Sequence, residues 1–188
     1  MKLPILAFGH PTLRKIAEPI SKDYSELNEL IADMFETMYS SKGVGLAAPQ
    51  IGKSIRLIVI DTSPFAEDYP DGKYFKKVFI NAKITDISGA NWIFNEGCLS
   101  VPELREDVTR SEKIHIEYYD QNFVFQSEDY EGIRSRVIQH EYDHLQGILF
   151  VDRVSSLKKM LIKRRLSEIS KGMVNPPYKM IFPYQKKR

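Results

Sequence analysis

The feature that most constrains this chain is the hexapeptide Gln139-His140-Glu141-Tyr142-Asp143-His144. In a helix, the two histidines project from the same face one turn apart, so that both imidazoles can bind one metal ion. Glu141, directly after the first histidine, then lies beside the metal and can take a proton from a water molecule. This HExxH pattern is a signature of zinc hydrolases, although an amphipathic helix with two half-buried histidines would also satisfy it. The hexapeptide therefore predicts a helix and a candidate metal site.

Length and composition indicate a globular protein with one substantial core. The chain has 188 residues, of which 43% are hydrophobic and 28% are charged, and its net charge of +2 does not by itself indicate a nucleic-acid partner. No apolar run approaches the roughly 20 residues that span a membrane, and residues 1–10 lack the apolar core of a signal peptide. Cys98 is the only cysteine, which excludes an intrachain disulfide and favours a reducing compartment. We therefore expect a cytoplasmic protein that does not contact membranes.

Apolar residues at helical spacing predict three helices. The first carries an apolar stripe from residue 27 to residue 38, with Asp23 or Ser25 as its N-cap and Gly43 as its stop. The second carries the hexapeptide and runs from Gly132 to Gly147. The third covers residues 155–170. Its outer side is basic, through Lys158, Lys159, Lys163, Arg164 and Arg165.

Runs of β-branched and aromatic residues predict the strands. Residues 56–61 read as one buried strand, and residues 77–87 as one or two more, bent at Asn81. Residues 113–119 alternate apolar and polar side chains, and residues 123–125 pair with them as a hairpin.

These elements predict an α+β fold. Mixed, largely antiparallel strands pack around a central helix that carries the HExxH motif, and a further helix lies near the C-terminus. We expect one catalytic domain over residues 1–172, followed by a loose C-terminal tail over residues 173–188, which is rich in proline and ends in basic residues.

Residues 43–50, GVGLAAPQ, fit neither a helix nor an ordinary strand. Two glycines allow another group to approach the backbone closely, and small residues keep the adjoining space open. Gln50 follows with an amide that can donate hydrogen bonds. Taken alone, the segment predicts a turn with tight packing, and it lacks the Gly-Lys-Ser/Thr ending of a phosphate-binding loop.

A catalytic site of the zinc type needs a third protein ligand and an open position. Cys98 lies in EGCLS, residues 96–100, before a break that we expect at Val101-Pro102. A lone cysteine can equally be a small buried apolar residue. Glu168 lies 24 positions after His144, and no histidine follows His144, which excludes signatures with a downstream histidine ligand. The residues alone leave both Cys98 and Glu168 open.

Three stretches together resemble one family, peptide deformylase. They are GVGLAAPQ at residues 43–50, EGCLS at residues 96–100 and QHEYDHLQG at residues 139–147. Each is a weak or moderate signal by itself, whereas all three in this order are specific, and none departs from the family pattern. The resemblance extends from the N-terminus to about Asp152 and leaves out the last helix and the tail.

The resemblance implies a metal held by Cys98, His140 and His144, with Fe(II) as the expected ion and Zn(II), Ni(II) or Co(II) able to replace it. It implies Glu141 as general base, and the Gln50 amide and the Leu99 backbone N–H as donors to the developing oxyanion. The implied reaction is hydrolysis of the N-formyl group from methionine at the start of nascent polypeptides.

The substrate-binding residues follow from the same resemblance. Gly45 would hydrogen-bond the extended main chain of the substrate through its bare backbone. Val44, Ile133 and Val137 would form the walls of an apolar methionine pocket. The basic C-terminal helix is a solvated face or a transient ribosome contact.

Two alternatives differ in what holds or uses the metal. A metallopeptidase would use His140, His144 and Glu168, leaving Cys98 structural. A non-catalytic metal-binding scaffold would fill the open position with His10 or His115, and it would not need Glu141.

Overall fold

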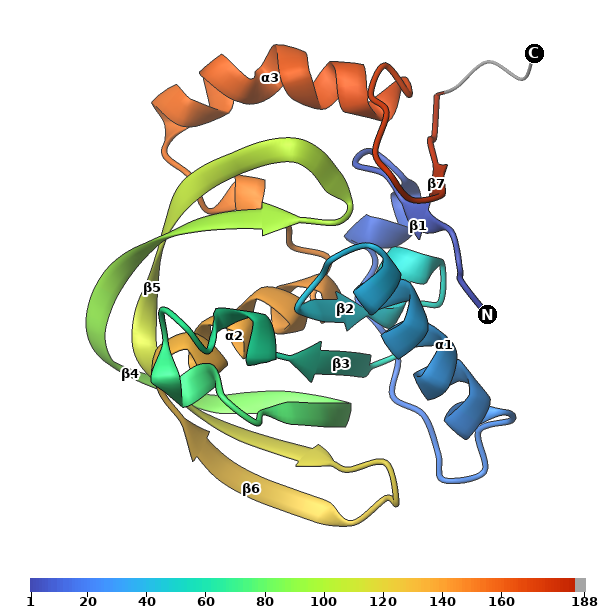
Figure 1. Cartoon of the computed structure of the whole chain (residues 1–188), viewed down its shortest axis with the longest axis vertical. Helices are drawn as coiled ribbons and strands as arrows, with labels where there is room; N and C mark the ends of the chain where they lie inside the picture. Colours follow the sequence, from blue (N-terminus) through green and yellow to red (C-terminus); the bar gives the residue numbers. More distant parts are fainter. Residues whose placement is uncertain (185–188) are drawn as a thin grey trace.

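The computed structural model describes residues 1–184, and its largest element is a five-stranded antiparallel sheet in the order β2-β3-β4-β5-β6. Figure 1 shows the sheet curving around a helix that lies inside the curve. The strands are β2 (Gly45–Ala47), β3 (Leu57–Asp61), β4 (Lys76–Cys98), β5 (Val101–Tyr119) and β6 (Phe125–Tyr130). The predicted α+β class, with largely antiparallel strands around the motif helix, is confirmed.

Strands β4 and β5 form one long hairpin that was only partly predicted. The bend at Asn81 is confirmed, because this residue has a φ of 54° and a register shift lies between Ile80 and Lys83. Beyond the predicted end at residue 87, however, β4 continues to Cys98. Exposed polar residues over this stretch hide the strand pattern, since one face of the hairpin meets water.

The expected break at Val101-Pro102 is wrong, because both residues belong to β5, and the chain turns at Leu99 and Ser100 instead. A proline is tolerated so close to the start of a strand. Cys98 therefore lies at the very end of β4, at the tip of the hairpin. Its side chain can contact residues outside the sheet from there.

Helix α2 (Gly132–Leu145) carries the hexapeptide and packs against β2, β3 and β5. Its start is fixed by Asp71, whose carboxylate accepts a hydrogen bond from the Ile133 N–H at 2.9 Å. It ends as predicted, with Gly147 in the left-handed region at a φ of 70°. A Cβ at this glycine would lie 2.6 Å from the Arg14 carbonyl oxygen, so the end of the helix needs glycine.

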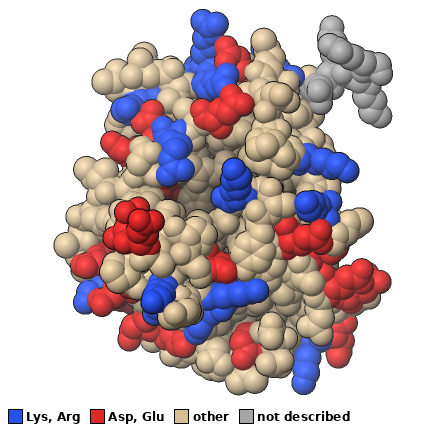
Figure 2. All heavy atoms as spheres, in the orientation of Figure 1, with Lys and Arg blue, Asp and Glu red and all other residues tan. Residues whose placement is uncertain are grey.

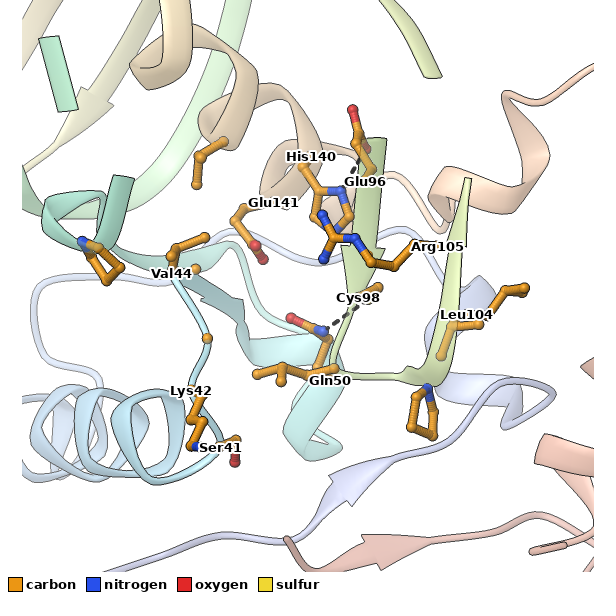
Figure 3. Close-up of a pocket in the computed structure, with 18 of the residues that line it drawn as sticks. Ser41, Lys42, Val44, Gln50, Glu96, Cys98, Leu104, Arg105, His140 and Glu141 are labelled. Carbon is orange, nitrogen blue, oxygen red and sulfur yellow. Dashed lines mark hydrogen bonds and ion pairs between the residues drawn. The ribbon is translucent and has the colours of Figure 1, made fainter. Parts of the chain in front are cut away.

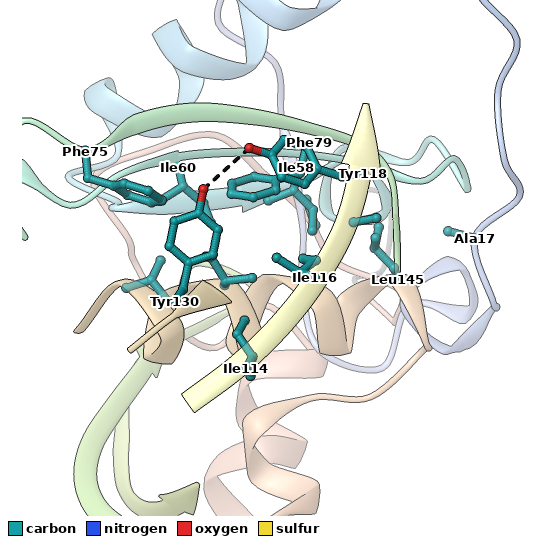
Figure 4. Close-up of a cluster of buried hydrophobic side chains, with 14 residues drawn as sticks. Ala17, Ile58, Ile60, Phe75, Phe79, Ile114, Ile116, Tyr118, Tyr130 and Leu145 are labelled. Atoms are coloured by element: carbon teal, nitrogen blue, oxygen red, sulfur yellow. Dashed lines mark hydrogen bonds between the residues drawn. The ribbon is translucent and has the colours of Figure 1, made fainter. Parts of the chain in front are cut away.

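The core beneath α2 is aromatic and branched aliphatic. Figure 4 shows its apolar side chains between the helix and the sheet, with the Tyr118 and Tyr130 hydroxyls facing each other. Phe79 is central to this cluster, with its ring centroid 4.4 Å from that of Tyr118. This packing fixes the helix against the sheet and so fixes the direction of the histidines that it carries.

Helix α1 (Leu27–Ser40) buries the predicted stripe, but its predicted cap is wrong. Glu26 occupies the N-cap position in the left-handed region at a φ of 58°, and it makes no side-chain cap hydrogen bond. Asp23 and Ser25 both precede the N-cap position, which Glu26 occupies. Burial of the apolar face, rather than a cap, therefore accounts for this helix.

The C-terminal part of the chain returns to the domain. Helix α3 (Ser156–Ser170) buries Ile162 and Ile169, and the Ser155 side chain caps it. Strand β7 (Met180–Ile181) then pairs in parallel with β1 (Ile5–Leu6), so the segment over residues 173–184 is packed rather than loose. The predicted basic end of the tail, Lys186 to Arg188, lies outside the described residues. None of the helices in residues 1–184 is both long and apolar enough to cross a membrane.

Candidate metal centre and active site

Three potential metal ligands converge at the tip of the β4–β5 hairpin. The thiol of Cys98 and one nitrogen each of His140 and His144 lie within 4.8 Å of one another. The Cys98 Sγ is 3.3 Å from the His144 Nε2. Two imidazoles come from successive turns of α2 and the thiol from a strand end, so three donors face a common point. Such a set suits Fe(II), Zn(II), Ni(II) or Co(II).

A buried carboxylate fixes the orientation of the first histidine. Glu96 accepts a hydrogen bond from the His140 Nδ1 at 2.8 Å, which leaves the Nε2 free to bind a metal. Burial alone would raise the pKa of Glu96, but hydrogen bonds from His140 and Arg110 outweigh it and lower the pKa. Glu96 is therefore a permanent anion that holds the ring of His140 in one orientation.

Two buried arginines complete this support. The Arg110 guanidinium donates to both oxygens of Glu96 and to Asp143, and Arg136 donates to Glu96 at 3.0 Å. Arg136 also lies over the Trp92 ring, 4.4 Å from its centroid. Two carboxylates and two guanidiniums thus pair inside the protein, where an unpaired charge would be strongly destabilising.

Glu141 is buried and free to act on a molecule in the cavity. Its Oε2 has no hydrogen-bond partner among the described residues. Burial raises the pKa of Glu141 to about 7, and the charges of Glu96 and Asp143 add to the shift while His140 opposes it. A carboxylate with such a pKa can both accept and release a proton near neutral pH.

Gly45 makes room for that carboxylate. A Cβ at this position would lie 2.4 Å from the Glu141 Oε1, so no side chain fits between β2 and α2. The close approach anticipated for this glycine-rich segment is therefore an approach by Glu141. Gly45 also begins a short edge strand, β2, where neither a helix nor a strand was expected.

Gln50 presents its amide to the same point. The Gln50 Oε1 accepts a hydrogen bond from the Ala47 N–H at 2.8 Å, so the NH₂ group faces the opposite way. It donates to the Cys98 Sγ at 3.4 Å and to the Ser100 Oγ at 3.3 Å. Figure 3 shows Gln50, Cys98, His140 and Glu141 around one space.

That space opens into a cavity of about 500 Å³. Val44, Gly45, Leu99 and Val137, all predicted to contact substrate, line it. Ile133 does not line it, because it is fully buried in the turn of α2 that packs against Gly72. Residues that the sequence did not single out also line the cavity, including Phe65, Phe94, Leu104, Arg105 and Tyr178.

The other candidate ligands lie elsewhere. Glu168 is on α3, where its carboxylate pairs with Arg164 and Arg165. His10 accepts a hydrogen bond from the Thr12 N–H, and His115 lies between Asp129 and Ser127 on the sheet. None of the three belongs to the cluster of Cys98, His140 and His144.

One face of the molecule carries charged side chains of both signs. In Figure 2, lysine and arginine side chains alternate with aspartate and glutamate over the face shown, around a central hollow. Interspersed charges of both signs do not form the continuous basic surface that binds nucleic acid.

A helix-borne His-Glu-x-x-His pair with a third donor and a buried carboxylate beside an open cavity is the arrangement of a metallohydrolase. Comparison with known proteins agrees with this class. The family model for polypeptide deformylase matches residues 2–160, and the chain belongs to that family.

Similar proteins extend this agreement to the whole chain. A peptide deformylase from Christiangramia forsetii is 54% identical, over 100% of this chain and 99% of its own length. A crystal structure of a peptide deformylase from Legionella pneumophila is 40% identical and covers 92% of this chain and 98% of its own, with a TM-score of 0.79. An Arabidopsis thaliana peptide deformylase is 30% identical and covers 94% of this chain and 98% of its own, with a TM-score of 0.80.

Of the supporting residues, Glu96 was within reach of sequence reasoning, because it begins the EGCLS stretch. Arg136 lies one turn before His140 on the motif helix, so its position on the same face could also have been inferred. Phe94 and Arg110 gave no such signal, because they lie in the part of the hairpin that no pattern revealed.

Proposed function

We propose that this chain hydrolyses the N-formyl group of N-formylmethionine at the start of newly synthesised polypeptides and releases formate. The observation that carries the proposal is the convergence of Cys98, His140 and His144 within 4.8 Å, beside the unpartnered carboxylate oxygen of Glu141. Membership of the polypeptide deformylase family supports the same reaction.

The three donors would hold a divalent cation, which we propose to be Fe(II), with Zn(II), Ni(II) or Co(II) as substitutes. One thiol and two imidazoles fit such an ion, and the His144 Nε2 that lies 3.3 Å from the Cys98 Sγ has no carboxylate partner that would compete with a metal among the described residues. When bound, the ion supplies a Lewis acid that polarises a carbonyl and makes water more acidic. The metal content of protein purified without oxygen tests the choice of ion.

Proton transfer falls to Glu141. Its carboxylate accepts the proton of the attacking water and passes it to the departing amine, so the same group serves as base and then as acid. Burial keeps this carboxylate in a region where electrostatic interactions are strong. The Gln50 NH₂ group and the Leu99 N–H donate to the oxygen on which negative charge develops, and one such donor contributes about 3 kcal/mol in comparable acyl-transfer sites.

The cavity fits an extended peptide that begins with methionine. Val44 and Val137 line its apolar part, and a fully buried methionine side chain contributes about 1.5–3 kcal/mol. Among residues 1–184, strand β2 pairs only with β3, so the outer edge of Gly45 can pair with the substrate main chain.

We place this activity in the cytoplasm, close to the ribosome that supplies the substrate. Helix α3 exposes Leu157, Met160 and Leu161 among its basic side chains. Apolar and cationic groups side by side suit a transient contact with the ribosome surface.

The decisive experiment compares three tripeptides that begin with formyl-Met, acetyl-Met and formyl-Gly, at equal concentrations, by following the release of the free amine. Formyl-Met should react fastest, because formyl carries a hydrogen where acetyl carries a methyl group beside Gly45 and Gln50. A single methylene-sized difference discriminates by about 10- to 200-fold, and a clash with the attacking geometry discriminates by more. Efficient cleavage of acetyl-Met, or of an internal peptide bond, would refute the proposal.

A further inference from the structure

The segment over residues 173–184 forms an outer layer against the site. Strand β7 lies alongside β1 in Figure 1, and the Ile5 and Ala7 N–H groups donate to the Lys179 and Ile181 carbonyls, both at 2.9 Å. Every second residue of the segment faces inward, as in a strand. The inward residues are Val174, Pro176, Tyr178, Met180 and Phe182.

Residues next to these two strands also hold the turn that joins β4 to β5. The Phe8 N–H donates to the Ser100 carbonyl at 2.8 Å, and the Tyr178 hydroxyl donates to the Leu99 carbonyl at 2.9 Å. The segment also contacts Glu103, which accepts from the Asn175 N–H at 3.4 Å and pairs with Arg165. Residues far apart in sequence therefore hold this turn from outside.

This turn carries the groups on which the proposed chemistry depends. Cys98 lies immediately before Leu99, and the Ser100 hydroxyl accepts a hydrogen bond from the Gln50 amide. Leu99 has its N–H on one side of its Cα and its carbonyl on the other. Anchoring the carbonyl to Tyr178 while Cys98 is held beside His144 limits rotation of the Leu99 backbone and so fixes where its N–H points.

Tyr178 is suited to this task. It is half-buried, lines the cavity, and keeps its hydroxyl proton, because burial and the nearby Cys98 and Glu103 raise its pKa. The Tyr178 ring is rigid and is already packed inward with Pro176 and Met180, so it loses little conformational freedom when its hydroxyl donates a hydrogen bond to a carbonyl.

We propose that Tyr178 is a positioning residue for deformylation. In this proposal, the C-terminal segment contributes to the active site by holding the turn at Leu99. Through the Leu99 carbonyl, Tyr178 holds the Leu99 N–H in line with the oxyanion. This role rests on the proposed function, in which that N–H is a donor. Because a preorganised donor acts mainly in the transition state, the effect belongs to kcat rather than to KM.

The test compares Tyr178→Phe with the matched control Tyr184→Phe. Both variants remove one hydroxyl from the same segment, but the Tyr184 side chain is 66% exposed and does not line the cavity. On a formyl-Met tripeptide, Tyr178→Phe should lower kcat about five- to tenfold, the effect of one hydrogen bond, with KM changed less than twofold. Tyr184→Phe should match the wild type.

Amide hydrogen exchange and melting temperature are measured on the same samples. In Tyr178→Phe the amides of Leu99 and Ser100 should exchange faster, while the rest of the sheet and the melting temperature stay close to the wild type. Unchanged kcat, or a loss of activity that only follows a general loss of stability, would overturn the role of Tyr178. If the wild type itself does not deformylate the tripeptide, the proposed function is wrong. If exchange at Leu99 and Ser100 is unchanged in Tyr178→Phe, Tyr178 does not hold the turn, whatever the activity.

Discussion

The single residue with the largest consequence is Glu141. It is buried beside two histidines, and its pKa is raised to about 7 because burial disfavours its charged form. A structural metal site has no need of an unpartnered buried carboxylate, which costs stability unless it has a task. Its presence therefore favours the proposed catalytic site over a metal-binding scaffold.

Glu141→Gln should keep the fold and the metal but lose activity by at least about 100-fold, because an amide cannot accept the proton. Metal content, melting temperature and kcat on a formyl-Met tripeptide are the measurements. Glu131→Gln, at an exposed position just before α2, is the control and should be close to the wild type. Near-normal turnover in metal-loaded Glu141→Gln would remove this residue from the mechanism.

A second residue decides between the two sets of metal ligands. Cys98→Ala should lose the metal or nearly all activity, because it removes one of three donors that lie within 4.8 Å. Glu168→Gln should change little, since Glu168 pairs with Arg164 and Arg165 on an exposed helix. Metal analysis of both variants is the check. Retention of metal in Cys98→Ala together with its loss in Glu168→Gln would support the metallopeptidase instead.

Among the elements, the contact between β2 and α2 is the most demanding. The strand reaches the helix only because Gly45 leaves space for the Glu141 carboxylate. The helix carries Glu141, the proposed general base, together with both histidines, and the strand has the free edge that we propose for substrate. The close packing of β2 against α2 therefore depends on the absence of a side chain at Gly45.

Gly45→Ala should displace Glu141 and reduce kcat at least about tenfold, because misplacing a catalytic group lowers the rate steeply. Overpacking should also cost about 1–3 kcal/mol of unfolding free energy, measured by denaturant titration. Gly97→Ala is the matched control. Its Cβ would meet the Arg105 side chain at 2.7 Å and not the Glu141 carboxylate, so the overpacking there should leave Glu141 in place. Equal effects of the two substitutions would contradict the role given to Gly45.

At the scale of the whole molecule, one contact links three strands of the sheet through Glu128. Its carboxylate accepts hydrogen bonds from Lys77 on β4, Tyr118 on β5 and Tyr130 on β6. Burial alone would raise the pKa of Glu128, but these hydrogen bonds outweigh it and lower the pKa. The carboxylate thus ties together strands whose contacts are distant in sequence.

Glu128→Gln should destabilise the protein by about 1 kcal/mol at pH 7, after allowance for partial exposure. Because the folded-state pKa is lowered, the stabilising effect is complete above the unfolded-state pKa near 4.3 and is lost as the pH falls through the folded-state value. The difference in unfolding free energy from the wild type should therefore shrink below about pH 4. A difference that stays constant from pH 7 to pH 3 would contradict this account.

The sequence by itself determined the motif helix, the stripe of α1, the hairpin near residue 120 and the bend at Asn81, because these depend on local spacing and turn chemistry. It also indicated His140, Glu141 and His144 through the HExxH spacing, and Cys98 through the family resemblance. Only the tertiary structure decided which of Cys98 and Glu168 lies with the histidines, since that depends on how the hairpin tip meets α2.

The tertiary structure also decided the structural features that no local sequence pattern predicts. Strand β4 runs through polar residues because its partner supplies the hydrogen bonds, and Glu26 begins α1 without a cap because burial stabilises that helix. The return of residues 173–184 depends on a strand at the opposite end of the chain. Contacts between distant segments fix these features, and a sequence read through local periodicity does not contain them.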